Sequence, residues 1–118
     1  MADNIGIIQQ NFPPAATAAQ LYAIPNGFQL VVSSLVINNQ GAALDNVWVS
    51  FRKGGAADAD SQYYMGAGPG QAGGGVPVGI ANPFVATLGL TFGVGDQIWV
   101  KSLLGTTSFQ IFGDLINS

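Results

Sequence analysis

Apolar and polar residues alternate in short runs along this chain, and turns rich in Gly, Pro, Asn and Asp separate the runs. In segment 46–53, Val47, Val49 and Phe51 fall on one side of an extended backbone, and segment 84–92 repeats the same period. A period of two is typical of half-buried β-strands, because successive side chains point to opposite faces. No segment has the period of a helix, so the pattern predicts an all-β protein.

About eight short strands with such turns predict a single-domain β-sandwich, and a jelly-roll-like arrangement is favoured over an immunoglobulin-like one. The predicted strands cover residues 20–25, 28–39, 46–53, 61–65, 76–78, 84–92, 97–104 and 108–116. Segment 28–39 is the longest and is apolar on both faces, so we expect it to be central and buried on both sides.

Two segments stand outside this regular pattern. Residues 1–19 are expected to form an extended N-terminal arm ahead of a sandwich domain at 20–118, and Pro13 and Pro14 interrupt any regular element there. An apolar arm frays when it is alone, so it is expected to pack on a neighbouring subunit. Residues 66–79 hold seven of the 17 glycines and predict a long loop of a kind that is often functional.

The composition suggests that much of the surface is covered. Charged residues make up 8% of the 118 residues and hydrophobic residues 48%. Ordinary soluble domains carry roughly 25% charged residues, and a surface with so few charges is poorly protected against association. We therefore expect other subunits to cover part of this surface. The alternative is a monomer that is solvated by Ser, Thr, Asn and Gln.

Charge and hydropathy also exclude several partners. The net charge is −3, and the cations are an adjacent pair, Arg52 and Lys53, and a lone Lys101, so no basic stripe for nucleic acid is expected. No apolar run reaches the ~18 residues of a spanning helix, and the N-terminus lacks the pattern of a signal peptide, so no membrane contact is predicted.

Side chains for catalysis are scarce. The chain has no His, no Cys and no Glu, so nucleophile–His pairs and thiolate metal sites are ruled out and an enzyme is not expected. Segment 68–73 matches G-x-G-x-x-G, but no helix is predicted after it, and no cofactor is expected. Asp58 and Asp60 are a weak candidate pair for a hard cation, against the simpler reading of a solvated turn. Asp45 and Asp96 are expected in loops or turns.

Two tryptophans are predicted on the polar side of their strands. If Val47 and Val49 face the core, Trp48 shares the outer face with Arg52; by the same logic, Trp99 shares it with Lys101. Exposed tryptophan is characteristic of contact surfaces. Reversed faces, or a loop that covers the rings, are the alternatives.

Four segments carry a family resemblance. The phrases YAIPNG (22–27) and GDQIWV (95–100), the strand 33–39 that ends in two asparagines, and SFQIFG (108–113) together resemble small virion proteins of tailed bacteriophages. The resemblance covers residues 20–53 and 84–116 and implies a β-sandwich structural protein. It supplies no catalytic residue.

This resemblance implies a non-enzymatic capsid decoration or cement protein that bridges capsid subunits and stabilises the shell. The implied partners are the major capsid protein or other virion proteins, and analogy with jelly-roll decoration proteins implies a homotrimer. The implied location is the virion, most simply the capsid surface, after synthesis in the host cytoplasm. The residues predicted to make subunit contacts are Ile5, Ile7, Ile8, Phe12, Trp48, Tyr63, Tyr64, Gly70, Gly74 and Trp99.

Two other functions remain open at this stage. A neck, tail or baseplate accessory protein would have the same kind of sequence, and the number of copies per particle would distinguish it. A carbohydrate-binding or receptor-binding module would use aromatic residues such as Trp48, Trp99, Tyr63 and Tyr64 to stack on sugars.

Overall fold

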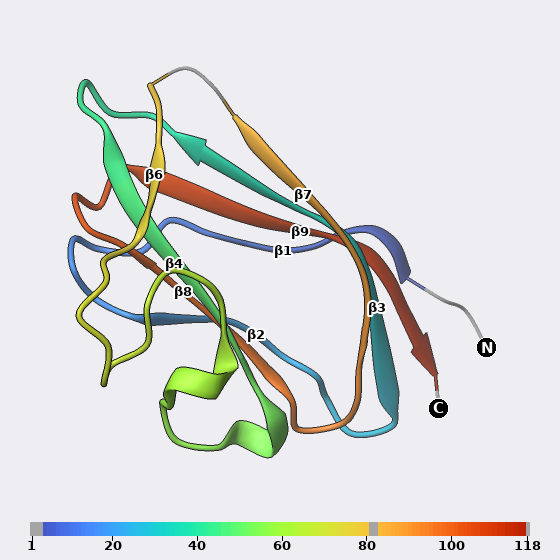
Figure 1. Cartoon of the computed structure of the whole chain (residues 1–118). Helices are drawn as coiled ribbons and strands as arrows, with labels where there is room; N and C mark the ends of the chain where they lie inside the picture. The colour runs from blue at the N-terminus through green and yellow to red at the C-terminus, as the bar shows by residue number, and fades with distance from the viewer. Residues whose placement is uncertain (1–3, 81–82, 118) are drawn as a thin grey trace.

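The alternating segments build two antiparallel sheets that pack face to face in the computed structural model, which describes residues 4–80 and 83–117 (Figure 1). Its elements are β1 (Asn4–Asn11), β2 (Ala19–Ala23), β3 (Phe28–Asn39), β4 (Asp45–Arg52), the 3-10 turns η1 (Lys53–Gly55) and η2 (Asp60–Gln62), β5 (Tyr63–Met65), β6 (Val76–Val78), β7 (Phe84–Phe92), β8 (Gln97–Ser102) and β9 (Thr107–Asn117). Within these described residues, no helix has the length and apolar character needed to cross a membrane.

The strand order is that of a jelly roll. One sheet has the order β1-β9-β3-β7 and the other has the order β2-β8-β4-β5. The short strand β6 also pairs with β4, at Asp45 to Val47, on the same edge where β5 pairs at Val49 and Ser50. Nine strands therefore occupy eight positions, which is the number in a jelly roll built from two Greek keys. The predicted β-sandwich of this type is confirmed.

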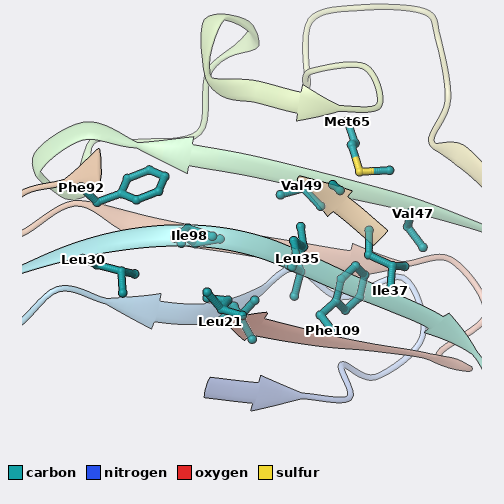
Figure 2. Packing of buried hydrophobic residues seen from close by; sticks show 14 of the residues in the cluster. Leu21, Leu30, Leu35, Ile37, Val47, Val49, Met65, Phe92, Ile98 and Phe109 are labelled. Atoms are coloured by element: carbon teal, nitrogen blue, oxygen red, sulfur yellow. The ribbon is translucent and has the colours of Figure 1, made fainter. Parts of the chain in front are cut away.

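Apolar side chains from both sheets fill the space between them (Figure 2). Val47 and Val49 of β4 face inward, as predicted, and meet the fully buried Phe109 and Leu35 of the other sheet's strands within one cluster. Strand β3 is central, between β9 and β7, as predicted. The expectation that both of its faces are buried is wrong, because Val31 and other outward residues of β3 are half-exposed.

A line of irregularities crosses the sheet β1-β9-β3-β7. One extra residue interrupts the pairing at Ile8 of β1 and at Ser33 of β3, and Leu88 and Gly89 of β7 form a bulge opposite Ser33. All three lie beside Phe112 of β9, which is opposite Ile7 and Ser34. Figure 1 shows that β3 and β9 curve together. Bulges increase the local twist and bend a strand, so the sheet folds over the core along this line.

The N-terminal segment is extended, as expected, and it is an edge strand of its own chain. Strand β1 pairs with β9 along almost its whole length, from Asn4 opposite Leu115 to Asn11 opposite Phe109. Ile8 packs against the core. The residues after β1 return along β8, where the N–H of Ala16 donates to the carbonyl of Ser102 at 2.8 Å.

Candidate functional site

Both tryptophans lie on the outer face of the sheet β2-β8-β4-β5, as predicted. In the register of β4 with β8, Trp48 lies opposite Lys101 and Trp99 lies opposite Ser50. The Nζ of Lys101 is 4.6 Å from the ring centroid of Trp48, and the guanidinium carbon of Arg52 is 4.1 Å from that of Trp99. Cation–π contacts of this kind hold each cation over a ring, so one face of each tryptophan is already occupied.

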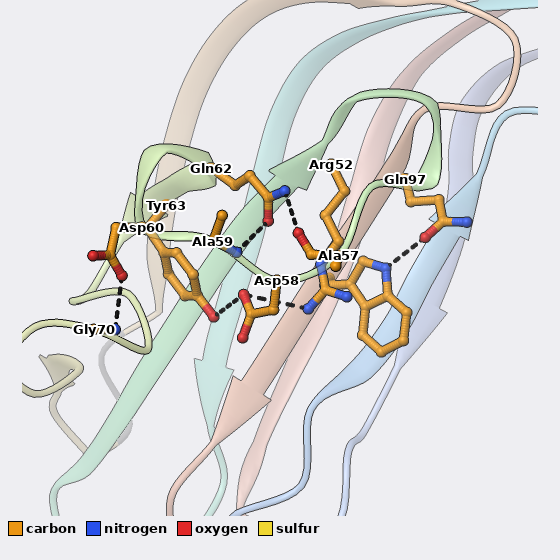
Figure 3. A network of polar contacts seen from close by, with 10 residues as sticks. Arg52, Ala57, Asp58, Ala59, Asp60, Gln62, Tyr63, Gly70 and Gln97 are labelled. Atoms are coloured by element: carbon orange, nitrogen blue, oxygen red, sulfur yellow. Dashed lines mark hydrogen bonds and ion pairs between the residues drawn. The ribbon is translucent and has the colours of Figure 1, made fainter.

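A polar network holds Arg52 in place beside Trp99 (Figure 3). An Arg52 guanidinium nitrogen is 3.5 Å from Oδ1 of Asp58, and the hydroxyl of Tyr63 donates to the same oxygen at 2.7 Å. Partial burial raises the pKa of Tyr63 to about 12, and the hydrogen bond to the carboxylate of Asp58 adds to that rise. Trp99 donates through Nε1 to Gln97 at 2.8 Å. Arg52, Asp58, Tyr63, Trp99 and Gln97 are thus linked to one another, while the buried Nε of Arg52 has no hydrogen-bond partner among the described residues.

The candidate carboxylates for a metal ion have separate partners. While Asp58 binds Arg52 and Tyr63, Asp60 accepts from the N–H of Gly70 and from Nε2 of Gln71, both at 2.8 Å. These two hydrogen bonds lower the pKa of Asp60. Among the described residues no three metal-ligating side chains come together. The role of Asp60 is therefore to fasten the loop that follows β5.

The Gly-rich loop at 66–79 is anchored at both ends. A Cβ on Gly66 would lie 2.5 Å from the ring of Trp48, so the loop backbone itself covers part of that ring. The N–H of Ala67 donates to the carbonyl of Gly74 at 3.1 Å, and β6 then returns the chain to the edge of β4. Of the glycines predicted to make subunit contacts, Gly70 and Gly74 both lie exposed in this loop.

The remaining predicted contact residues are in different environments. Ile7 and Phe12 are 56% and 54% exposed, whereas Ile8 is partly buried and packs against the core of its own chain. The side chain of Ile5 lies outside the described residues. Tyr64 is 45% exposed.

The outer face of the sheet β1-β9-β3-β7 is almost uncharged. Among the described residues of these four strands, Asp114 is the only charged one, while Arg52, Lys53 and Lys101 all belong to the other sheet and its connections. Two cross-strand rows follow from the register, and each combines apolar with neutral polar side chains. The rows are Ile7-Phe112-Ser34-Thr87 and Gln10-Gln110-Val36-Val85.

A cleft of about 430 Å³ lies where strand β5 of one sheet faces strand β7 of the other. Phe51, Tyr64, Leu88 and Leu90 supply its apolar lining, and Thr87 is among its polar lining residues. The rings of Phe51 and Tyr64 stack with centroids 5.4 Å apart. None of the described residues that line this cleft is charged.

Sequence reasoning placed Asp45 in a loop, and this was wrong. It is the first residue of β4 and is completely buried. Its carboxylate accepts hydrogen bonds from the hydroxyls of Ser102 and Thr107 and from the N–H groups of Leu104 and Asn46. Three of these partners are more than 55 residues away, so no local pattern could have indicated the network.

Comparison with known proteins supplies no relative for this chain. It matches no family model, no curated protein and no solved structure. The resemblance to phage virion proteins therefore stays a prediction.

Proposed function

We propose that this chain is a non-enzymatic structural subunit of a virion, and specifically a capsid decoration protein that binds the shell through the outer face of the sheet β1-β9-β3-β7. The observation that carries the proposal is the distribution of charge, because that face has one carboxylate and no cation among its described residues. Proteins that stay monomeric usually carry charged side chains on their exposed faces, which keep them soluble. The centres of protein–protein interfaces, in contrast, are depleted of charged residues.

The fold and the scarcity of catalytic groups support the same reading. Jelly rolls are common among viral capsid proteins, although they also occur in lectins and cupins, and a fold alone does not fix a function. A cement protein needs rigid strands and buried apolar area between subunits, and it needs no catalytic site. A carbohydrate-binding role is supported less well, because Arg52 and Lys101 already cover one face of each tryptophan.

A matched pair of substitutions tests the proposed contact face. Gln110 is on the uncharged face, and Gln20 is exposed on the outer face of the other sheet, opposite Trp99. Gln110→Lys should weaken binding to purified capsids about tenfold or more, because it buries an unpaired ammonium group. Gln20→Lys should leave binding unchanged. Both affinities can be measured by co-sedimentation of the full chain with shells.

Three outcomes would contradict this assignment. If Trp48→Ala weakens shell binding while Gln110→Lys does not, the contact lies on the other sheet. Quantitative mass spectrometry of purified particles then separates the virion roles: a copy number comparable to that of the major capsid protein supports decoration, and a low number supports a neck, tail or baseplate role. Absence from particles contradicts the proposal.

A further inference from the structure

Strand β7 is an open and uncharged edge of the sandwich. In the described chain its nine residues pair with β3 on one side only, which leaves the backbone N–H and C=O groups of the other side without a strand partner. Natural sheets usually protect such an edge with charge or proline. Here Val85 and Leu90 are instead apolar and 56% and 37% exposed. The bulge at Leu88 and Gly89 still leaves residues 84–87 as regular strand.

The cleft beside β7 adds an apolar hollow to this apolar edge. Leu88 and Leu90 belong to both, and Phe51 and Tyr64 form the opposite side of the hollow. We call β7 together with the cleft the strip. Along this strip, exposed apolar side chains lie next to a recess that can accept apolar side chains.

We propose that two copies of this chain associate along this strip, with their β7 strands antiparallel across a two-fold axis. An isologous contact requires a surface that complements itself, so that each copy contributes the same protrusions and the same recess. Pairing of the two edges would satisfy the open backbone groups, and Leu90 of each copy would approach the cleft of the other. This inference rests on the proposed function and deepens it by naming the self-association surface. It replaces the homotrimer that the family resemblance implies with a two-fold contact.

A second copy is the partner that the charges favour. No residue of β7 and no described residue that lines the cleft is charged, so two identical strips meet without bringing like charges together. A stable interface covers roughly 800 Å² of each partner, which is about one seventh of the chain's 5917 Å² surface.

The other sheet edges are less suitable. The edge formed by β5 and β6 consists of two three-residue strands and contains Pro77, which cannot donate a hydrogen bond. Strand β1 is long and uncharged, but the hollow beside it is lined mainly by polar residues such as Gln10, Gln40 and Ser108. The remaining edge strand, β2, has five residues. Among the described strands, β7 therefore combines a nine-residue open edge with an apolar recess.

Sedimentation velocity of the full chain, over a wide range of concentration, tests the pairing. The wild-type chain should behave as a monomer–dimer equilibrium. Leu90→Lys should raise the dissociation constant about tenfold or more, because each dimer would bury two unpaired ammonium groups. Leu44→Lys is the control, since Leu44 is 56% exposed in the turn between β3 and β4 and should leave the equilibrium unchanged. Thr87→Lys, at an exposed position of the same strip, replaces the first variant if that one fails to fold.

Single cysteines test the two-fold axis, because the chain has no cysteine of its own. In an antiparallel self-pairing, only residues near the axis meet their own copies, so oxidation of Val85→Cys, Thr87→Cys and Leu90→Cys should cross-link efficiently at one position or two adjacent ones. Asn26→Cys, in the exposed turn before β3, should cross-link only by random collision.

Several outcomes would overturn the inference. The chain could stay monomeric, or it could form a trimer, in which β7 would have to meet a different edge. Dissociation of the dimer by Leu44→Lys but not by Leu90→Lys would also contradict the inference. So would cross-linking that is equally efficient at all the cysteine positions. A monomeric chain that binds shells overturns the β7 pairing and leaves the proposed function standing. A chain that dimerises through β7 but does not bind shells overturns the proposed function and leaves the β7 pairing standing.

Discussion

A single buried carboxylate joins distant parts of the chain. Asp45, at the start of β4, binds the end of β8 through Ser102 and the start of β9 through Thr107. Burial by itself would raise the pKa of Asp45, but the hydrogen bonds to its oxygens outweigh that effect, so its pKa lies below the ordinary value of 3.8. The ionised form is therefore the one that stabilises the fold.

The pH dependence of stability follows from this sign. The contribution of Asp45 to the free energy of unfolding should be complete above pH 3.8 and should be lost as the pH falls through the lowered pKa of the folded state. Asp45→Asn should cost about 2–4 kcal/mol at neutral pH, because the amide cannot accept all four hydrogen bonds. Urea unfolding of both proteins at a series of pH values would measure this. An equal difference at every pH would contradict the linkage.

At the level of strands, the bend of one sheet depends on Gly113. A Cβ at this position would lie 2.0 Å from the carbonyl oxygen of Val31, which is far closer than atoms can approach. The hydroxyl of Ser33 donates to the carbonyl of Phe112 at 3.1 Å beside it and closes the irregular pairing. The strands β3 and β9 can therefore come this close only where a residue has no side chain.

Alanine substitutions at two glycines should separate this close approach from a general effect of glycine. Gly113→Ala should lower the free energy of unfolding by about 2–4 kcal/mol, because backbone atoms must move to admit the methyl group. Gly74→Ala should change it little, since nothing lies within 4 Å of that Cβ. Thermal and urea unfolding measure both. A Gly113→Ala protein as stable as the wild type would show that the bend relaxes freely.

Local pattern explains which elements could be predicted. Alternation alone placed β4 and β7, because the period of two fixes which side chains face the core, and it put Trp48 on the correct face. The bulges at Ile8 and Ser33 arise from the register in which neighbouring strands pair. The alternation within a single strand does not determine this register. The cleft also depends on how β5 faces β7 across the two sheets, so residues such as Leu90 could not be recognised in advance as its lining.

For the whole molecule, the cations and the proposed self-association strip lie on different parts of the surface. This separation should determine how self-association responds to salt. The three cations lie with one sheet, whereas the strip at β7 contains no charge. Screening by salt weakens contacts between charges and hardly affects contacts between apolar groups. Self-association along the strip is therefore expected to be governed by apolar burial.

Raising the concentration of sodium chloride should leave the dissociation constant of the dimer nearly unchanged, and sodium sulfate should lower it, because excluded salts strengthen apolar burial. Sedimentation velocity in the two salts makes the comparison. The wild-type chain and the Gln20→Lys variant should respond alike, since Gln20 is on the other sheet. Dissociation by sodium chloride would show that charged groups hold the copies together.

Strands β5 and β6 occupy the same position at the edge of β4, and this affects how well the sheet tolerates insertions. Both strands dock on β4 within a few residues of each other, at Val49 and at Val47, so the loop between them begins and ends at neighbouring fixed points. Lengthening a loop whose ends are held adds little entropic cost, and the eight positions of the jelly roll stay as they are. The exposed residues 72–74 of this loop are thus a natural insertion point, where new sequence can be carried on the surface without redesign of the sandwich beneath it.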